Sequence, residues 1–359
     1  MFLYSKNFYS NVHKFKFLYI SRRSFLERTL TSCIAFHSYK GGTGKTTIAA
    51  NLAALLAKKG YRVFLLDLDV YAPSLQAYFG KKPNRWINDF LNGTAEVGEV
   101  VMDVTSTVEE INNNIKITGR LWVGFCSSRK EEIYKLEGSS GGGKQDSSKI
   151  QLLRRFILLR EQLISLHDAD YIIIDTSPGI RYWSINALAV ADTLFLTLKM
   201  GDLDIDGTRK MADEIYGSFT KFGAKSYLVM NRVAGYCIPH DIIPDPNIST
   251  IPSSSSSSSP DTRGTTNAST DESLLSYRNQ RGRTTATMQL QADESKNISN
   301  TLASQVRMDV ISSIACYCDI QFTSKEFLTA IKYPDHPFAK QIERLIETME
   351  AMPNTKAKQ

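Results

Sequence analysis

Eight residues decide the fold of this 359-residue chain: Lys40-Gly41-Gly42-Thr43-Gly44-Lys45-Thr46-Thr47. Their glycine spacing is typical of a phosphate-binding loop, in which backbone N–H groups surround the phosphates and a lysine reaches the β and γ oxygens. The apolar stretch before the loop, residues 32–39, predicts a buried strand, and the Ala- and Leu-rich stretch after it, residues 47–60, predicts a helix. Strand, glycine loop and helix in this order predict a nucleotide-binding site.

A second lysine, Lys40, opens the loop. A lysine beside a loop is usually a solvated charge, but at the mouth of a phosphate-binding loop a cation neutralises phosphate charge. The loop with both lysines resembles that of the ParA/MinD ATPases, the family with a deviant phosphate-binding loop. The resemblance implies that ATP and Mg²⁺ are the cofactors and that the nucleotide contacts Gly41, Gly42, Thr43, Gly44, Lys45, Thr46 and Thr47. It also implies that Lys45 acts within its own subunit while Lys40 reaches the phosphates of a partner, so that ATP joins a homodimer.

A pair of acids follows the second strand candidate, in the segment RVFLLDLDVYAPS at residues 62–74. Asp67 and Asp69 alternate at the strand end, so both carboxylates are expected at the carboxyl edge of the sheet. A carboxylate there holds a Mg²⁺-bound water or orients the attacking one. The match to the family's Asp-x-Asp segment implies that Asp69 positions the water and Asp67 supports the metal shell. The alternative is that both acids cap the next helix.

A third acid ends the apolar run YIIIDTSPG at residues 171–179. A strand that ends in an acid, here Asp175, has the Walker B layout, in which the carboxylate holds Mg²⁺ through water while the Thr46 hydroxyl completes the site. The segment 176–179 is then a switch loop whose backbone senses the γ-phosphate.

The strand candidate YLVMNRV at residues 227–233 contains Asn231 near its end. Relatives of the resembled family use an asparagine to read the adenine edge, and an amide suits this task because it both donates and accepts. The alternative is that Asn231 only forms a turn.

Seven apolar stretches have the composition of strands, and helical patterns separate most of them. They fall near residues 33–39, 62–68, 121–126, 171–175, 193–199, 226–231 and 309–315. This alternation predicts the α/β class: a doubly wound, mostly parallel sheet with helices on both faces, as in P-loop NTPases, and a ligand at the carboxyl ends of the strands. Because the strands form one series, we expect a single ATPase domain over residues 31–350.

Several segments fall outside this pattern. Residues 138–148 predict a flexible Gly/Ser loop, and the Ser-rich residues 244–305 predict a disordered insertion, because they contain too little apolar surface to offset the entropy of ordering. Residues 351–359 are expected to form a tail. Residues 1–30 form a basic, aromatic extension, or the start codon is misassigned.

The extension at residues 1–30 contains six Lys or Arg residues, one acid and eight Phe or Tyr residues. Such a segment suits an anionic membrane surface, nucleic acid or a transit sequence. It supplies +5 of the formal net charge of +6, so the remaining chain is close to neutral. The charge count therefore does not predict a basic DNA-binding face, although DNA binding stays open.

The five cysteines are odd in number and scattered: Cys33, Cys126, Cys237, Cys316 and Cys318. This pattern predicts a reducing compartment rather than a disulfide framework. The Cys-x-Cys pair at 316 and 318 raises a rival interpretation, because Mrp-type iron–sulfur carriers share the deviant loop and bind a cluster with paired cysteines. Their spacing is Cys-x-x-Cys, however, and two residues on one side of a strand also pack against a core.

Two further patterns favour structure over ligand binding. Residues 202–213 resemble a calcium loop in their acids, but a helical pattern from Thr208 interrupts the loop, so the acids are expected to form a solvated loop before that helix. Residues 338–351 have apolar positions at helical spacing, which predicts a core helix rather than a membrane-targeting one.

The resemblance therefore predicts a Mg²⁺-dependent ATPase, slow unless a partner stimulates it, that works as an ATP-switched homodimer and positions or partitions a cargo in the cytoplasm. The cargo and the activating protein are not identified by the sequence, and the nucleoid and a membrane surface stay open as places of action. The alternatives are an Mrp-like iron–sulfur carrier and a nucleotide-binding adaptor without turnover. The presence of Lys45, Asp69 and Asp175 argues against the adaptor.

Overall fold

The structure of the protein is a computed structural model, and it describes ten stretches of the chain. These are residues 31–129, 131, 145–199, 202–221, 223–233, 297, 300–301, 303–317, 320 and 328–352. The basic extension at 1–30, most of the Ser-rich segment 244–305 and nearly all of the tail at 351–359 lie outside the described residues. The described residues of the Ser-rich segment, 297, 300–301 and 303–305, are helical.

The described residues contain one sheet of eight strands: β1 (Ser32–His37), β2 (Arg62–Leu68), β3 (Val101–Asp103), β4 (Arg120–Gly124), β5 (Tyr171–Thr176), β6 (Thr193–Lys199), β7 (Lys225–Val233) and β8 (Val310–Ala315). Their spatial order is β3-β4-β2-β5-β1-β6-β7-β8. All neighbours pair in parallel except β3 and β4, which are antiparallel. The predicted α/β fold is confirmed, and the strand that the prediction missed is the three-residue edge strand β3.

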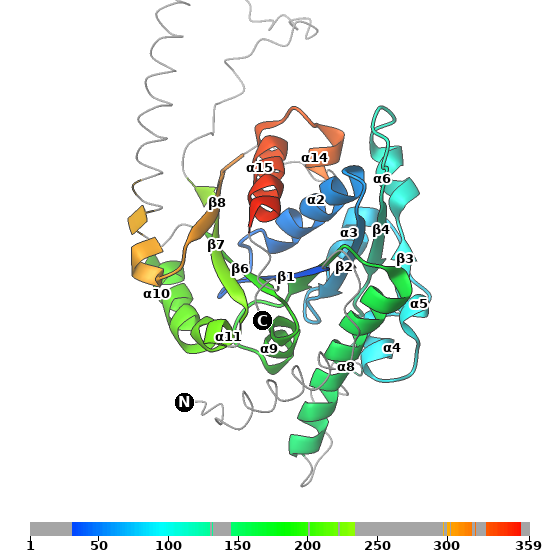
Figure 1. The fold of residues 1–359 in the computed structure, drawn as a ribbon, viewed down its shortest axis with the longest axis horizontal. Helices are drawn as coiled ribbons and strands as arrows, with labels where there is room; N and C mark the ends of the chain where they lie inside the picture. The colour runs from blue at the N-terminus through cyan, green and yellow to red at the C-terminus, as the bar shows by residue number, and fades with distance from the viewer. Residues whose placement is uncertain are drawn as a thin grey trace, which may run out of the picture.

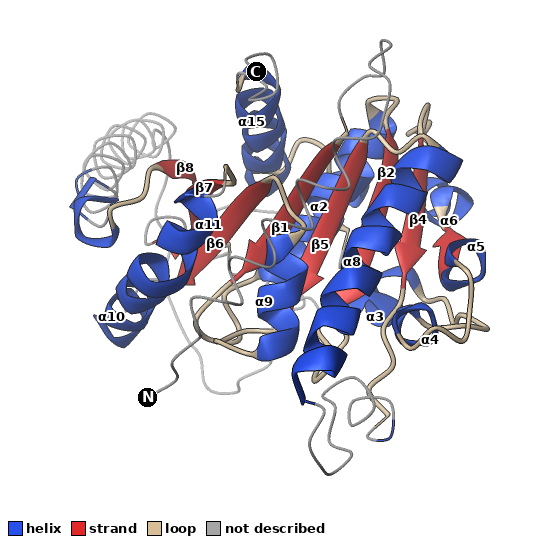
Figure 2. Ribbon diagram, turned by 60° about the horizontal axis from the view of Figure 1, so that its bottom comes forward, coloured by secondary structure: helices blue, strands red, loops and turns tan. Residues whose placement is uncertain are grey.

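Helices cover both faces of the sheet (Figures 1 and 2). One face packs against α2 (Lys45–Lys58), α3 (Leu75–Phe79), α6 (Thr105–Ile111), α14 (Thr329–Lys332) and α15 (Pro337–Ala351). The other packs against α4 (Ile87–Leu91), α5 (Val97–Val100), α8 (Gln145–His167), α9 (Tyr182–Ala189), α10 (Asp202–Met211), the π-helical turn η1 (Ala212–Tyr216) and α11 (Gly217–Lys221). Strands covered on both faces are apolar almost throughout, as β5 shows with five of its six residues buried.

Two helices begin earlier than the sequence pattern predicts. The helix α10 starts at Asp202, so the acids expected to form a loop before Thr208 lie in a helix instead. Helical backbone across these acids also rules out a twelve-residue calcium loop there. The helix α8 starts at Gln145, inside the stretch 138–148 that was predicted to be a flexible loop. Residues 138–144 lie outside the described residues.

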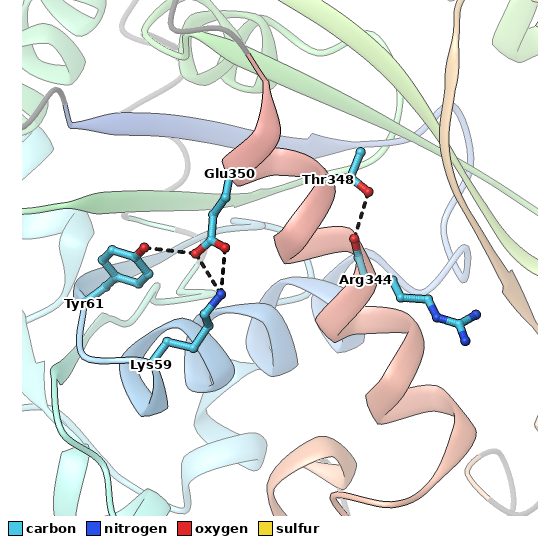
Figure 3. A network of polar contacts seen from close by, with 5 residues as sticks. All are labelled: Lys59, Tyr61, Arg344, Thr348 and Glu350. Atoms are coloured by element: carbon cyan, nitrogen blue, oxygen red, sulfur yellow. Dashed lines mark hydrogen bonds and ion pairs between the residues drawn. The ribbon is translucent and has the colours of Figure 1, made fainter.

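The last helix, α15, packs on the sheet as predicted. Phe338, Ile342, Leu345 and Ile346 are buried in the same cluster as α2. At its end, Glu350 accepts hydrogen bonds from Lys59 at 2.7 and 2.9 Å and from the Tyr61 hydroxyl at 2.9 Å (Figure 3). These contacts join the C-terminal helix to the end of α2. Across the described part of the chain, every helix is too short or too polar to cross a membrane.

Candidate nucleotide site

The glycine loop joins β1 to α2 at the carboxyl edge of the sheet. From β1 the chain continues toward β2 and β4 on one side, and later toward β6, β7 and β8 on the other, so the strand order reverses at β1. Ligands of open α/β sheets bind at such a reversal, outside the carboxyl ends of the strands. The fold therefore places the loop where a ligand is expected.

The loop has the backbone of an anion-binding turn. Gly42 and Gly44 have φ values of 75° and 89°, a left-handed conformation that glycine adopts without strain. The helix α2 begins at Lys45, and its N-cap Gly44 supplies no side-chain hydrogen bond to the first turn. The donors of a helix N-terminus suit a phosphate as acceptor, because the helix dipole also favours negative charge there.

The two lysines of the loop lie in different surroundings. Lys45 is only 6% exposed, and its Nζ donates to the Ser38 hydroxyl at 3.1 Å. The Ser38 hydroxyl in turn donates to the backbone oxygen of Lys40 at 2.6 Å. Lys40 itself is exposed. One lysine is therefore enclosed with the loop, and the other faces outward at its mouth.

The structure brings Thr46 and Asp175 together from α2 and β5. The Thr46 hydroxyl donates to Asp175 Oδ2 at 2.5 Å, while Oδ1 of the buried Asp175 has no hydrogen-bond partner among the described residues. Burial raises the pKa of Asp175 to about 6, against the lowering effects of Lys45 and Thr46. A hydroxyl beside an orphaned carboxylate oxygen fits Mg²⁺, a cation that prefers oxygen ligands.

Asp67 lies at the end of β2, in register with Asp175 on β5. Its two oxygens accept the backbone N–H groups of Asp69 at 3.1 Å and of Ser74 and Leu75 at 3.2 Å each. Burial, and next the charge of Asp175, raise the pKa of Asp67 well above its ordinary value. In this structure Asp67 therefore orders the turn into α3 by accepting these three backbone N–H groups.

Asp69 lies in the loop after β2 and is 9% exposed. Its Oδ1 accepts a hydrogen bond from the Ser177 hydroxyl at 2.8 Å and one from the Ala72 N–H at 3.2 Å. Ser177 belongs to the loop after β5. Asp69 thus connects the loop after β2 to the loop after β5, which contains the predicted switch loop 176–179.

The side chain of Asn231, near the end of β7, contacts the glycine loop. Its Nδ2 donates to the backbone oxygen of Thr43 at 2.8 Å, and its Oδ1 accepts the Arg232 N–H at 2.9 Å. A Cβ built at Gly44 would overlap the Asn231 amide, so the two residues are in close contact. Asn231 here supports the loop from the end of β7.

Two further residues at this edge, His37 and Tyr78, were not predicted from the sequence. His37 is fully buried, and its Nδ1 lies 2.7 Å from the Thr176 hydroxyl, which donates to the Phe36 oxygen. The Thr47 hydroxyl lies 2.7 Å from the Tyr78 hydroxyl on α3. The sequence signal for His37 is a polar residue at the carboxyl end of an otherwise apolar strand, whereas Tyr78 on α3 carries no such signal.

Of the two cysteines considered as cluster ligands, the structure describes one. Cys316 follows β8 and is half-buried, and Cys318 lies outside the described residues. Within the portion of the chain that the structure describes, no three His, Cys, Asp or Glu side chains gather as ligands for a metal.

A family model described as an AAA domain matches residues 31–222. The chain is 33% identical over 153 residues to the flagellum site-determining protein YlxH of Helicobacter pylori, a match that covers 42% of each protein. It is 58% identical over 52 residues to the iron–sulfur cluster carrier protein of Aquifex aeolicus, which covers 14% of each. The matches thus span less than half of the length of these curated relatives.

The fold is similar to that of the septum site-determining protein MinD of Pyrococcus horikoshii, solved with Mg-ADP. The TM-score is 0.56 at 17% sequence identity, and the match covers 92% of this chain and 100% of that one. The family model covers more than half of the chain, and the glycine loop with its two lysines lies inside that match. The chain therefore belongs to the AAA domain family and is a member of the ParA/MinD-type ATPases.

Proposed function

We propose that this protein is a Mg²⁺-dependent ATP hydrolase that works as an ATP-switched homodimer and positions a cargo inside a cytoplasm. The observation that carries the proposal is the contrast between the enclosed Lys45 and the exposed Lys40 on one loop. An enclosed lysine binds phosphate within its own subunit. An exposed lysine at the mouth of the loop is placed to act on the nucleotide of a second subunit.

In this proposal the chain holds the nucleotide through its loop backbone, Lys45, Thr46 and Thr47. Thr46 and Asp175 would hold Mg²⁺, which when bound neutralises charge on the phosphates. Asp69 orients the water that attacks the γ-phosphate, and hydrolysis yields ADP and inorganic phosphate. The hydrogen bond from Ser177 to Asp69 supports this role, because it fixes the carboxylate between the loop after β2 and the loop after β5. Asn231 contacts the adenine while its Nδ2 keeps the hydrogen bond to the Thr43 oxygen of the glycine loop.

The cofactor assignment draws on the solved relative that carries Mg-ADP, and the positioning role draws on the site-determining relatives. We expect turnover to be slow and stimulated by an activating partner.

The test is the solution mass of the Asp69→Ala variant, measured by light scattering with and without Mg-ATP. The variant blocks hydrolysis, so an ATP-bound dimer accumulates and the mass doubles only when ATP is present. Lys40→Ala in the same background removes the lysine that reaches the partner, and it returns the mass to that of a monomer. A mass that ignores the nucleotide in both variants contradicts the switch.

A second candidate function is that of an iron–sulfur cluster carrier, which the 58% identity to the Aquifex aeolicus carrier favours. Reconstitution of the purified protein with iron and sulfide tests this candidate. A carrier reconstituted with iron and sulfide absorbs visible light, and the absorbance disappears in Cys316→Ser. Absorbance at the level of the buffer, together with an ATP-dependent dimer, rejects the carrier.

A further inference from the structure

Two glycines from distant segments contact the residues that precede Lys40. Gly179, in the loop after β5, donates its backbone N–H to the Ser38 oxygen at 2.9 Å. Gly207, in α10, lies against the ring of Tyr39, because a Cβ built at Gly207 would overlap three carbons of that ring. The chain just before Lys40 is therefore held from two sides.

The glycine at position 207 is explained by the Tyr39 ring and not by backbone conformation. Gly207 has helical residues on both sides, and its φ is not among the positive values that require glycine. A glycine inside a helix is unfavourable relative to alanine. At this position, however, any larger residue would occupy the space of the aromatic ring.

The segments next to the two lysines pack on opposite faces of the sheet. Lys45 belongs to α2, which packs on one face of the sheet. Tyr39 is half-buried against the cluster on the opposite face, where α10 follows β6. A displacement of α10 would therefore move the backbone at Lys40 and leave α2 in place.

We propose that Tyr39, seated against Gly207, is a positioning residue that fixes where Lys40 leaves the sheet. The inference rests on the function proposed above for Lys40, because only a lysine that acts on the nucleotide needs a fixed position. The Tyr39 ring, and not its hydroxyl, makes the contact with Gly207. The helix α10 thereby controls the direction of the outer lysine of the site through its contact with Tyr39.

The test substitutes Gly207→Ala in the full chain, with Gly217→Ala as matched control. Gly217 is also helical, but a Cβ there would meet its nearest atom, the Ala212 oxygen, at 3.7 Å, which is an ordinary contact. Hydrogen–deuterium exchange of the amides in residues 38–44 reports directly on the loop. We expect faster exchange in Gly207→Ala and the wild-type rate in Gly217→Ala.

Steady-state kinetics supply the second readout. Gly207→Ala should lower kcat for ATP about ten- to a hundredfold, because a small misplacement of a group that acts on the phosphates has effects of this size. KM should stay the same, because Lys45 and the loop still bind ATP. Tyr39→Phe keeps the ring and retains wild-type values, while Tyr39→Ala lowers kcat. The double variant Tyr39→Ala/Gly207→Ala should be no worse than Tyr39→Ala, since the clash is gone.

Unchanged exchange in residues 38–44 of Gly207→Ala overturns the inference, whatever the activity. If that variant does not fold, equal exchange in Tyr39→Ala and Tyr39→Phe overturns it instead. Lys40→Ala separates this inference from the proposed function. Full hydrolysis in Lys40→Ala refutes the role of Lys40, whereas lost hydrolysis in Lys40→Ala beside an unaffected Gly207→Ala refutes the positioning role of Tyr39.

Discussion

The strands β2 and β5 each carry an aspartate near the carboxyl edge of the sheet, and the two aspartates make different contacts. Asp67 and Asp175 pair in register, and both are buried. Asp67 accepts three backbone N–H groups, whereas Asp175 accepts the Thr46 hydroxyl and leaves Oδ1 without a partner among the described residues. We infer that an oxygen without a protein partner, and not burial alone, suits a buried carboxylate to bind a ligand.

The difference arises in the loops that follow the two strands. After β2 the chain turns back, so that the amides of residues 69, 74 and 75 point at Asp67. After β5 the chain crosses toward β1, where Gly179 bonds to Ser38, and Asp175 is left facing Thr46. We infer that Asp67 stabilises the fold of the site and that Asp175 serves its chemistry.

The sharpest test of this comparison is Asp175→Asn. We expect Mg²⁺-dependent phosphate release to fall by about 10²–10³-fold, because the neutral amide is a poor replacement for a carboxylate beside the metal and phosphates. The melting temperature should not fall, since burial already disfavours the charged form of Asp175. The exposed Asp206→Asn on α10 is the matched control. Hydrolysis within a few-fold of wild type in Asp175→Asn would break the comparison.

The converse variant is Asp67→Ala. We expect the free energy of unfolding to fall by roughly 2–4 kcal/mol, because three backbone donors lose their acceptor. Urea denaturation measures this loss. Asp175→Ala, which removes one hydroxyl contact, should cost less stability. Equal losses at the two positions would show that both acids are structural.

The pH dependence of His37 is the third test, since its Nδ1 lies 2.7 Å from the Thr176 hydroxyl at the end of β5. Burial, and next the charge of Lys45, lower the pKa of His37 from 6.5 to about 3. The folded state therefore binds the proton less readily than the unfolded chain. The stability contributed by neutral His37 is complete above pH 6.5 and is lost as the pH falls toward 3, at about 1.4 kcal/mol per unit.

The raised pKa of Asp175 acts in the opposite direction between about pH 4 and 6, where the folded state binds its proton more readily. The contribution of His37 is thus measured as a difference between proteins. Between pH 7 and 5, His37→Gln should lose about 2 kcal/mol less unfolding free energy than wild type. Parallel pH profiles for the two proteins would mean that His37 titrates normally.

The smallest effect is expected far from the site, at the end of α15. Glu350→Gln weakens the contacts to Lys59 and Tyr61 that Figure 3 shows. Lys59 and Glu350 are 42% and 27% exposed, so water screens their interaction. We expect a loss below about 1 kcal/mol in thermal unfolding and no change in hydrolysis. A larger loss would show that this network contributes as much as the buried one at Asp67.

Much of the fold follows from local pattern. Strands that helices cover on both faces are continuous apolar runs, which are recognisable in the sequence. Seven of the eight strands in the described residues lie where they were predicted. The strand β3 was missed because three residues carry no recognisable period. The start of α10 was missed because its acids resemble a loop, and the early start of α8 because Gly and Ser surround it.

The sequence by itself determined the class of fold, the glycine loop and the candidate set of acids. Those properties depend on residues close in the chain, where spacing and strand ends are read directly. Only the tertiary structure decided which acid keeps an oxygen for a ligand, that Asn231 lies on the loop, and that Gly207 seats Tyr39. These contacts join residues that are far apart in the sequence, and their geometry exists only once the sheet has brought the strand ends together.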